Sequence, residues 1–68
     1  MSINYRPLWV MLLNRNMKKT DLISLARLTS NTVANMGKCE YISLRNLEKI
    51  CRVLECTPND VIEFMEEK

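Results

Sequence analysis

The sequence has 68 residues, of which 47% are hydrophobic and 26% are charged, so we expect a single domain over residues 1–68 with a modest core. Its longest apolar run, residues 7–13, is too short to cross a bilayer, and the N-terminus lacks a secretory signal pattern, which together predict a cytoplasmic protein. Residues 1–38 hold six basic side chains and one acidic one, whereas residues 39–68 hold four basic and seven acidic ones. A basic half suits a polyanionic partner, and a solvated surface with chance asymmetry is the alternative interpretation.

The reactive side chains favour neither an enzyme nor a metal site. The chain has three cysteines, no CxxC spacing and no histidine, which argues against a disulfide framework or a zinc site. Cys51 and Cys56 fall in apolar helical segments, where a free cysteine packs as a small hydrophobic side chain; Cys39 falls in a predicted loop, with a redox role as the alternative. Because a glycine-rich phosphate loop and paired catalytic carboxylates are also missing, we expect no cofactor, no metal and no enzymatic activity.

One glycine, two prolines and little alternation of β-branched residues predict an all-α domain of five helices. The first helix is predicted over residues 5–14, with Asn4 as its cap and Pro7 in the first turn, where an N–H group has no intrahelical partner. We interpret Trp9 as a core or half-buried residue, with a self-association surface as the alternative. The polar segment 14–19 is predicted to be a loop.

Residues 20–36 predict two short helices joined by a tight turn. Thr20 is the predicted cap of the first of them, since its hydroxyl can accept a bond from a free backbone N–H group. Apolar residues then recur at helical spacing and predict a buried side made of Leu22, Ile23, Leu25 and Ala26. Leu28 closes the turn, and Thr29 is the predicted cap of the second helix.

The second of these helices has a polar, uncharged outer face. Val33 and Met36 are three residues apart and are predicted to face inward. The outward positions are Ser30, Asn31, Thr32, Ala34 and Asn35. Short hydrogen-bonding side chains suit the major groove of DNA, where base edges present donors and acceptors, whereas a merely solvated face usually carries Lys or Glu. Gly37 is predicted to end this helix in a left-handed conformation.

Two further helices are predicted in the C-terminal half. Ser43 caps a fourth helix that extends to Leu54, with an apolar stripe made of Leu44, Leu47, Ile50, Cys51 and Leu54. Thr57 caps a fifth helix, with Pro58 at its first position and Asp60 as the acid of a capping box. The apolar side of this helix is predicted to be Val61, Ile62, Phe64 and Met65.

This pattern resembles the Cro/cI-type (XRE-like) helix-turn-helix regulators of phages and bacteria, and the resemblance to their five-helix lambda-repressor-like domain covers nearly the whole chain. The tail ICRVLECTPNDVIEF, residues 50–64, is also similar to the end of a short single-domain subfamily, which runs like LCKALDCQPGDLLEY. Two positions depart from the family pattern, since Ile23 stands where Ala is usual and Arg27 where Gly is frequent. Arg27 must therefore avoid or adopt a left-handed backbone, at a cost of roughly 1 kcal/mol.

The resemblance implies that the second helix of the motif docks in the major groove, with its N-terminal residues on base edges. The implied base-contacting positions are Thr29, Ser30, Asn31, Ala34 and Asn35, and the implied phosphate-contacting positions are Lys19, Thr20, Thr32, Lys38 and Arg45. Asn31 and Asn35 each have the donor and the acceptor for a bidentate contact with adenine. An ordinary solvated side chain is the alternative interpretation at the polar positions.

We therefore predict a sequence-specific transcriptional regulator, expected to be a repressor, that binds double-stranded DNA over an inverted repeat. One recognition helix contacts too few base pairs to define a unique site, so we expect a homodimer. The fifth helix is the predicted dimer surface, through Val61, Phe64 and Met65; burial of Phe64 or Met65 in the monomer core is the alternative. The alternative function is an antitoxin or a protein-interaction module with the same fold, which implies a protein partner.

Overall fold

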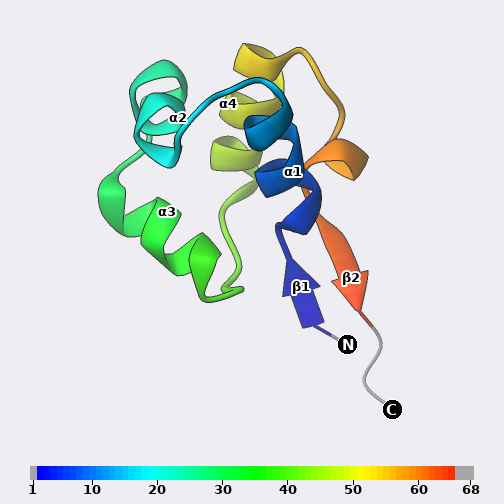
Figure 1. The fold of residues 1–68 in the computed structure, drawn as a ribbon. Helices are drawn as coiled ribbons and strands as arrows, with labels where there is room; N and C mark the ends of the chain where they lie inside the picture. The colour runs from blue at the N-terminus through cyan, green and yellow to red at the C-terminus, as the bar shows by residue number, and fades with distance from the viewer. Residues whose placement is uncertain (1, 66–68) are drawn as a thin grey trace.

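The computed structural model describes residues 2–65, which form four α-helices, one 3₁₀ turn and a two-stranded sheet. In chain order the elements are β1 (Ser2–Asn4), α1 (Arg6–Asn14), α2 (Lys19–Ala26), α3 (Ser30–Gly37), α4 (Leu44–Leu54), η1 (Pro58–Asp60) and β2 (Glu63–Met65). The two strands lie side by side at one end of the helical body, next to both ends of the chain (Figure 1). Within residues 2–65, no helix has the length and apolar character needed to cross a membrane.

The prediction of an all-α domain with five helices is wrong, because the expected fifth helix is a single turn followed by a strand. The turn begins as predicted: Pro58 occupies its first position, and the Thr57 N–H group donates to Asp60 Oδ2 at 3.2 Å. The chain then extends from residue 63 and pairs with β1 in an antiparallel register that places Ile3 opposite Phe64. A capping box fixes where a helix begins and not how far it continues, and here pairing with the distant N-terminus determines the rest.

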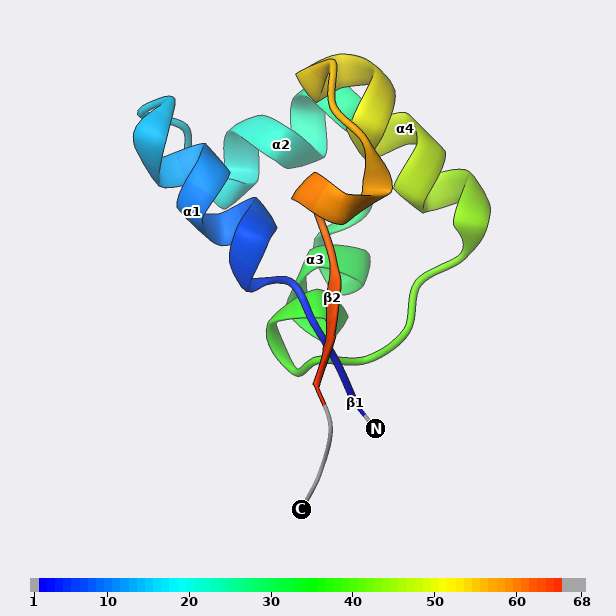
Figure 2. The same ribbon diagram turned by 90° about the vertical axis from the view of Figure 1, so that its right-hand side faces the viewer.

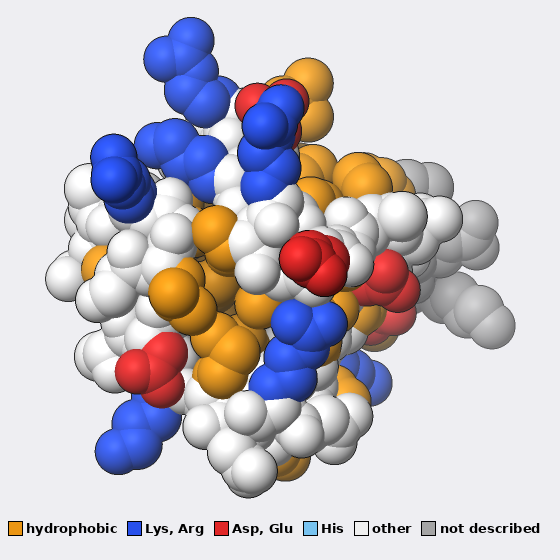
Figure 3. All heavy atoms as spheres, turned by 90° about the horizontal axis from the view of Figure 1, so that it is seen from above, with side chains coloured by type: hydrophobic (Ala, Val, Ile, Leu, Met, Phe, Trp, Pro, Cys, Tyr) orange, Lys and Arg blue, Asp and Glu red, His pale blue; other side chains and the backbone are white. Residues whose placement is uncertain are grey.

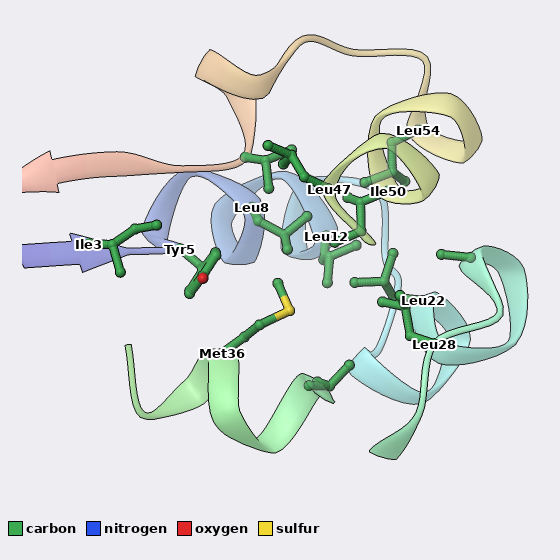
Figure 4. Packing of buried hydrophobic residues seen from close by; sticks show 13 residues of the cluster. Ile3, Tyr5, Leu8, Leu12, Leu22, Leu28, Met36, Leu47, Ile50 and Leu54 are labelled. Carbon is green, nitrogen blue, oxygen red and sulfur yellow. The ribbon is translucent and has the colours of Figure 1, made fainter. Parts of the chain in front are cut away.

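One hydrophobic core joins all four helices to β1 and to the segment that follows η1. Figure 4 shows side chains from β1, α1, α2, α3 and α4 pointing toward one another, with Met36 directed into the core from α3. Figure 2 shows η1 between α1 and α4, both of which it contacts. The buried members are Ile3, Tyr5, Leu8, Leu12, Leu22, Ala26, Leu28, Val33, Met36, Leu47, Ile50, Leu54 and Val61.

Side-chain caps begin two helices where they were predicted and one where they were not. Thr29 Oγ1 accepts a bond from the Thr32 N–H group at 3.0 Å, and Ser43 Oγ accepts one from the Asn46 N–H group at 3.1 Å. The prediction that Thr20 caps its helix is wrong, because α2 already begins at Lys19. The Lys18 N–H group donates to Asp21 Oδ2 at 2.8 Å, so the acid in the first turn satisfies the backbone two residues before Thr20. The prediction that Asn4 caps α1 is wrong, because α1 begins at Arg6 and its N-cap is Tyr5. Asn4 lies one residue earlier, in β1, and its Oδ1 accepts from the Arg6 N–H group at 3.0 Å.

All four helices end on a left-handed residue, and none of these residues is glycine. They are Asn16 (φ 56°), Arg27 (φ 55°), Cys39 (φ 61°) and Glu55 (φ 52°). After each one, the next N–H group bonds to the carbonyl five residues back, from Met17 to Leu12, Leu28 to Ile23, Glu40 to Asn35 and Cys56 to Cys51. This is the Schellman pattern of helix termination. The prediction that Gly37 supplies the left-handed position is wrong, because Gly37 is the last residue of α3 and Cys39 takes that role.

The apolar stripes are narrower than predicted. In α4, Leu47, Ile50 and Leu54 are buried, but Leu44 at the start of the helix is 81% exposed. In α2, Leu25 is 56% exposed, so the prediction that it lies on the buried side is wrong. In both helices fewer positions face the core than the apolar pattern predicts, and the positions beside the buried strip face solvent.

Candidate nucleic-acid interface

The segment between α2 and α3 is a three-residue turn, as the motif predicted. Arg27 adopts the left-handed conformation (φ 55°, ψ 45°), so it takes on the strain that a glycine would avoid. The Leu28 N–H group bonds to the Ile23 carbonyl at 3.0 Å, and the Leu28 side chain is buried. The two helices are therefore fixed at their junction by a backbone bond and by an apolar side chain that enters the core.

The next helix, α3, is anchored from beneath by Val33 and Met36, which are 5% and 0% exposed. This orientation places Ser30, Asn31 and Ala34 on the solvent side, all exposed, with Asn35 half-buried beside them. The exposed face carries hydroxyl, amide and methyl groups and no charge, which is the set of groups that suits base edges in the major groove.

Thr29 is less free than its neighbours, because its hydroxyl already caps α3. It accepts the Thr32 N–H group and lies 2.8 Å from the Thr32 hydroxyl oxygen. Both side chains therefore have a structural role at the start of the helix. Thr29 is exposed and Thr32 is half-buried, so both hydroxyls are on the rim of the solvent-facing surface.

The remaining predicted phosphate-contacting residues come from α2, from the segment that follows α3 and from α4. Lys19 and Thr20 lie in the first turn of α2, Lys38 directly follows α3, and Arg45 is the second residue of α4; all four side chains are exposed. Seen from above, Lys and Arg side chains stand on both sides of a central group of hydrophobic side chains (Figure 3). Three of the four residues are basic, and they are contributed by α2, by the residue after α3 and by α4.

Tyr5 holds the loop that follows α3, a role that sequence reasoning missed because its partner lies 35 residues away in the sequence. Its ring is fully buried, and its hydroxyl donates to the Glu40 carbonyl at 2.5 Å. Burial raises the pKa of the Tyr5 phenol, so it stays a neutral donor. Beside this bond is an open hollow of about 320 Å³, lined by Asn4, Tyr5, Arg6, Trp9, Cys39 and Met65.

Cys51 and Cys56 lie on the two sides of the left-handed end of α4 and are half-buried. Burial raises the pKa of both thiols, which keeps them protonated at neutral pH. An apolar contact between the residue after the left-handed position and a residue in the last turn of the helix commonly accompanies the Schellman pattern. Within residues 2–65, no three side chains of the metal-binding types come together.

The residues predicted for a dimer surface are divided between core and surface. Val61 is 0% exposed and packs in the monomer core, so it is not available as a surface residue. Phe64 and Met65 lie on β2 and are 60% and 45% exposed. Neither is buried in the monomer core, although Met65 Sδ accepts a bond from the Asn4 amide.

The motif and its anchored polar helix define a helix-turn-helix protein. This chain belongs to the Cro/C1-type HTH DNA-binding domain family, whose sequence profile matches residues 7–67. It is 39% identical over 57 residues to YozG, an uncharacterized HTH-type transcriptional regulator of Bacillus subtilis (strain 168), in an alignment that covers 81% of this chain and 68% of YozG. The crystal structure of the transcriptional regulator VanUg superposes with a TM-score of 0.92 at 38% identity, over 97% of this chain and 88% of that one. The family resemblance drawn from the sequence is confirmed, and the family is one of DNA-binding regulators and not of enzymes.

Proposed function

We propose that this protein is a sequence-specific transcriptional repressor that inserts α3 into the major groove of double-stranded DNA. The observation that carries the proposal is the uncharged polar face of α3, held outward by the burial of Val33 and Met36. Membership in a family of DNA-binding regulators supports the same assignment.

The base contacts are assigned to the exposed N-terminal part of α3. Asn31 and Asn35 have the donor and acceptor for adenine, and the Ala34 methyl group suits the methyl group of thymine. The Ser30 hydroxyl can bond to several bases. The Thr29 hydroxyl already accepts the Thr32 N–H group, so it contacts the DNA only with its remaining hydrogen-bonding capacity. We expect Asn31 to contribute most to specificity, because its amide is exposed and Asn35 is half-buried.

The phosphate contacts are assigned to Lys19 and Thr20 on one side of the groove, to Thr32 within α3, and to Lys38 and Arg45 on the other side. These contacts set the position and orientation of α3 and carry no sequence information of their own. Of these side chains only Lys19, Lys38 and Arg45 are charged, so each subunit neutralises about three phosphates. The logarithm of the binding constant should therefore fall with the logarithm of the salt concentration with a slope of roughly −3 per subunit.

The same proposal includes a homodimer formed through β2. Within residues 2–65 the sheet has two strands, so β2 is paired with β1 on one edge only. An unpaired edge with exposed apolar side chains is a template for pairing with another chain, and Phe64 and Met65 provide those side chains. A two-fold dimer would place two copies of α3 about 34 Å apart, on an inverted repeat.

A protein-interaction module or antitoxin is the second candidate function. The observation in its favour is the exposure of apolar side chains away from α3, since Leu13 is 75% exposed and Leu44 is 81% exposed. Surfaces of this kind can hold another protein. Stable co-purification of a second protein, together with no selection of DNA sequences, would favour this candidate.

Selection of bound duplexes from a random-sequence pool tests the main proposal. We expect the wild-type protein to enrich an inverted repeat, and Asn31→Ala to enrich the same repeat with one position per half-site relaxed. Enrichment of no sequence by the folded protein would contradict the proposal. Enrichment of an unpaired half-site would contradict the homodimer alone.

A further inference from the structure

Trp9 is the only tryptophan of the sequence, and its ring is in contact with a cation. The Lys19 Nζ atom lies 4.4 Å from the centre of the ring, well within the range of a cation–π contact. Trp9 is half-buried in α1, and its ring is tilted by 57° against that of Tyr5, with 6.4 Å between the ring centres. The indole is therefore fixed by the core on one side and available to Lys19 on the other.

Lys19 is in a position where a lysine is otherwise unfavourable. It is the first residue of α2, where the helix dipole disfavours a positive charge. Its side chain is exposed, and an unrestrained lysine side chain loses considerable rotamer entropy when a phosphate immobilises it. Contact with the Trp9 ring offsets the unfavourable interaction between the ammonium group and the helix dipole. It also reduces the entropy that is lost when a phosphate binds, because it restricts the ammonium group before any ligand binds.

The Trp9 ring also lies close to the C-terminal end of α3. Trp9 lines the open hollow together with Cys39, the residue after Lys38. The Tyr5–Glu40 bond holds the same loop against the start of α1. Trp9 thus lies between the two segments that carry Lys19 and Lys38, both of which are proposed phosphate contacts.

We propose that Trp9 is a positioning residue of the DNA interface, whose ring holds the Lys19 ammonium group in place for a backbone phosphate. This inference rests on the proposed DNA-binding function and deepens it. Trp9 acts through Lys19 and makes no base contact, so it contributes to affinity on all sequences and not to the choice among them.

The contact can be tested first in the protein without DNA. In proton NMR spectra, the Lys19 side-chain methylene signals should be shifted upfield by the ring current of Trp9. Those of Lys18, the preceding exposed lysine, serve as the matched control. In Trp9→Leu the Lys19 signals should move to the positions found for Lys18. Unshifted Lys19 signals in the wild type would overturn the inference whatever the protein binds.

A double-mutant cycle then tests the role in binding, with a random-sequence duplex as the probe. Lys19→Met should weaken binding and flatten the salt slope by about one unit, because one phosphate contact is lost. Trp9→Leu should weaken binding by roughly 2- to 5-fold, and Trp9→Phe by less, because a phenyl ring attracts a cation more weakly. In the Lys19→Met background, Trp9→Leu should have no further effect on binding. Circular dichroism and thermal melts establish that each variant is folded.

The outcomes separate this inference from the proposed function. If the wild type binds duplex DNA and Trp9→Leu lowers affinity equally with and without Lys19, then Trp9 acts only through folding or through another group, and the inference is overturned. If Trp9→Leu binds as well as the wild type, it is also overturned, while the proposed function stands. If the folded wild type binds no DNA, the proposed function fails and the inference fails with it, even where the ring-current shift is observed.

Discussion

Replacing Gly37 by Ala and Cys39 by Gly, which shifts the only glycine of the sequence by two positions, should stabilise the domain. Gly37 lies in the last turn of α3 with a negative φ, where it uses none of its conformational freedom. Cys39 has a φ of 61° and ends the same helix, in a conformation that glycine adopts without a steric penalty. We therefore expect Gly37→Ala and Cys39→Gly each to raise the free energy of unfolding.

The size of each effect follows from the local structure. A Cβ atom added at Gly37 meets nothing within 4 Å, so Gly37→Ala gains the helix propensity difference of roughly 0.5–1 kcal/mol without a clash. Cys39→Gly relieves a left-handed strain of about 1–2 kcal/mol, part of which is offset by the greater freedom of glycine in the unfolded chain. Since Cys39 is exposed, the change removes no buried contact. Together the substitutions should add about 1–2 kcal/mol.

Urea denaturation and thermal melts measure this effect. For a domain of this size, each kcal/mol corresponds to a rise in melting temperature of roughly 4–8 °C. Cys39→Ala is the matched control, because it removes the thiol and keeps the left-handed strain, so it should leave stability near the wild-type value. Lys38→Gly, at φ −94°, should destabilise. The reasoning is refuted if Cys39→Gly is no more stable than Cys39→Ala.

Four further predictions concern the interface, the loop and the assembly. Asn31→Ala should reduce discrimination at one base position by ~1–3 kcal/mol while non-specific binding persists, as measured by competition between duplexes; a uniform loss on all sequences would contradict the α3 assignment. Lys38→Ala should weaken binding to all duplexes and flatten the salt slope by about one unit, and an unchanged slope would exclude a phosphate contact. Tyr5→Phe should cost about 1 kcal/mol at neutral pH, since the Glu40 carbonyl loses its donor. The raised pKa of Tyr5 means that unfolding releases a proton above pH ~10, so wild-type stability should fall there as the pH rises, and Tyr5→Phe should show a smaller fall. Phe64→Glu should remain folded and lose the dimer in analytical ultracentrifugation; a folded variant with wild-type dimerisation would remove β2 from the interface.

The features that the sequence predicted well are determined by residues close together in the chain. Thr29 and Ser43 cap their helices because each donor lies three residues from its acceptor. The helix-turn-helix motif was predictable for the same reason, since the burial of Val33 and Met36 alone orients the polar face of α3. The left-handed conformation of Arg27 was also anticipated as one of two outcomes.

The features that could not be predicted depend on distant partners. Residues 63–65 form a strand because they pair with residues 2–4. No local pattern predicts a pairing partner some sixty residues away in the sequence. Val61 could not be distinguished from Phe64 as core or surface, because the hypothesis of a helix gave both the same apolar face. Gly37 was assigned the left-handed role on residue type alone, although the backbone reaches that conformation at Cys39. The contacts of Tyr5 with Glu40 and of Trp9 with Lys19 likewise join separate elements.

The pairing of β1 with β2 has a consequence for how the chain is made. β1 is the first and β2 the last of the described elements, so β1 has no strand partner until residues 63–65 have been synthesised. Until then Ile3 and Tyr5 lack the cover that Val61 and β2 complete. We therefore expect the sheet, and with it the strand edge through which two copies would associate, to form only after the residues of all four helices have been synthesised.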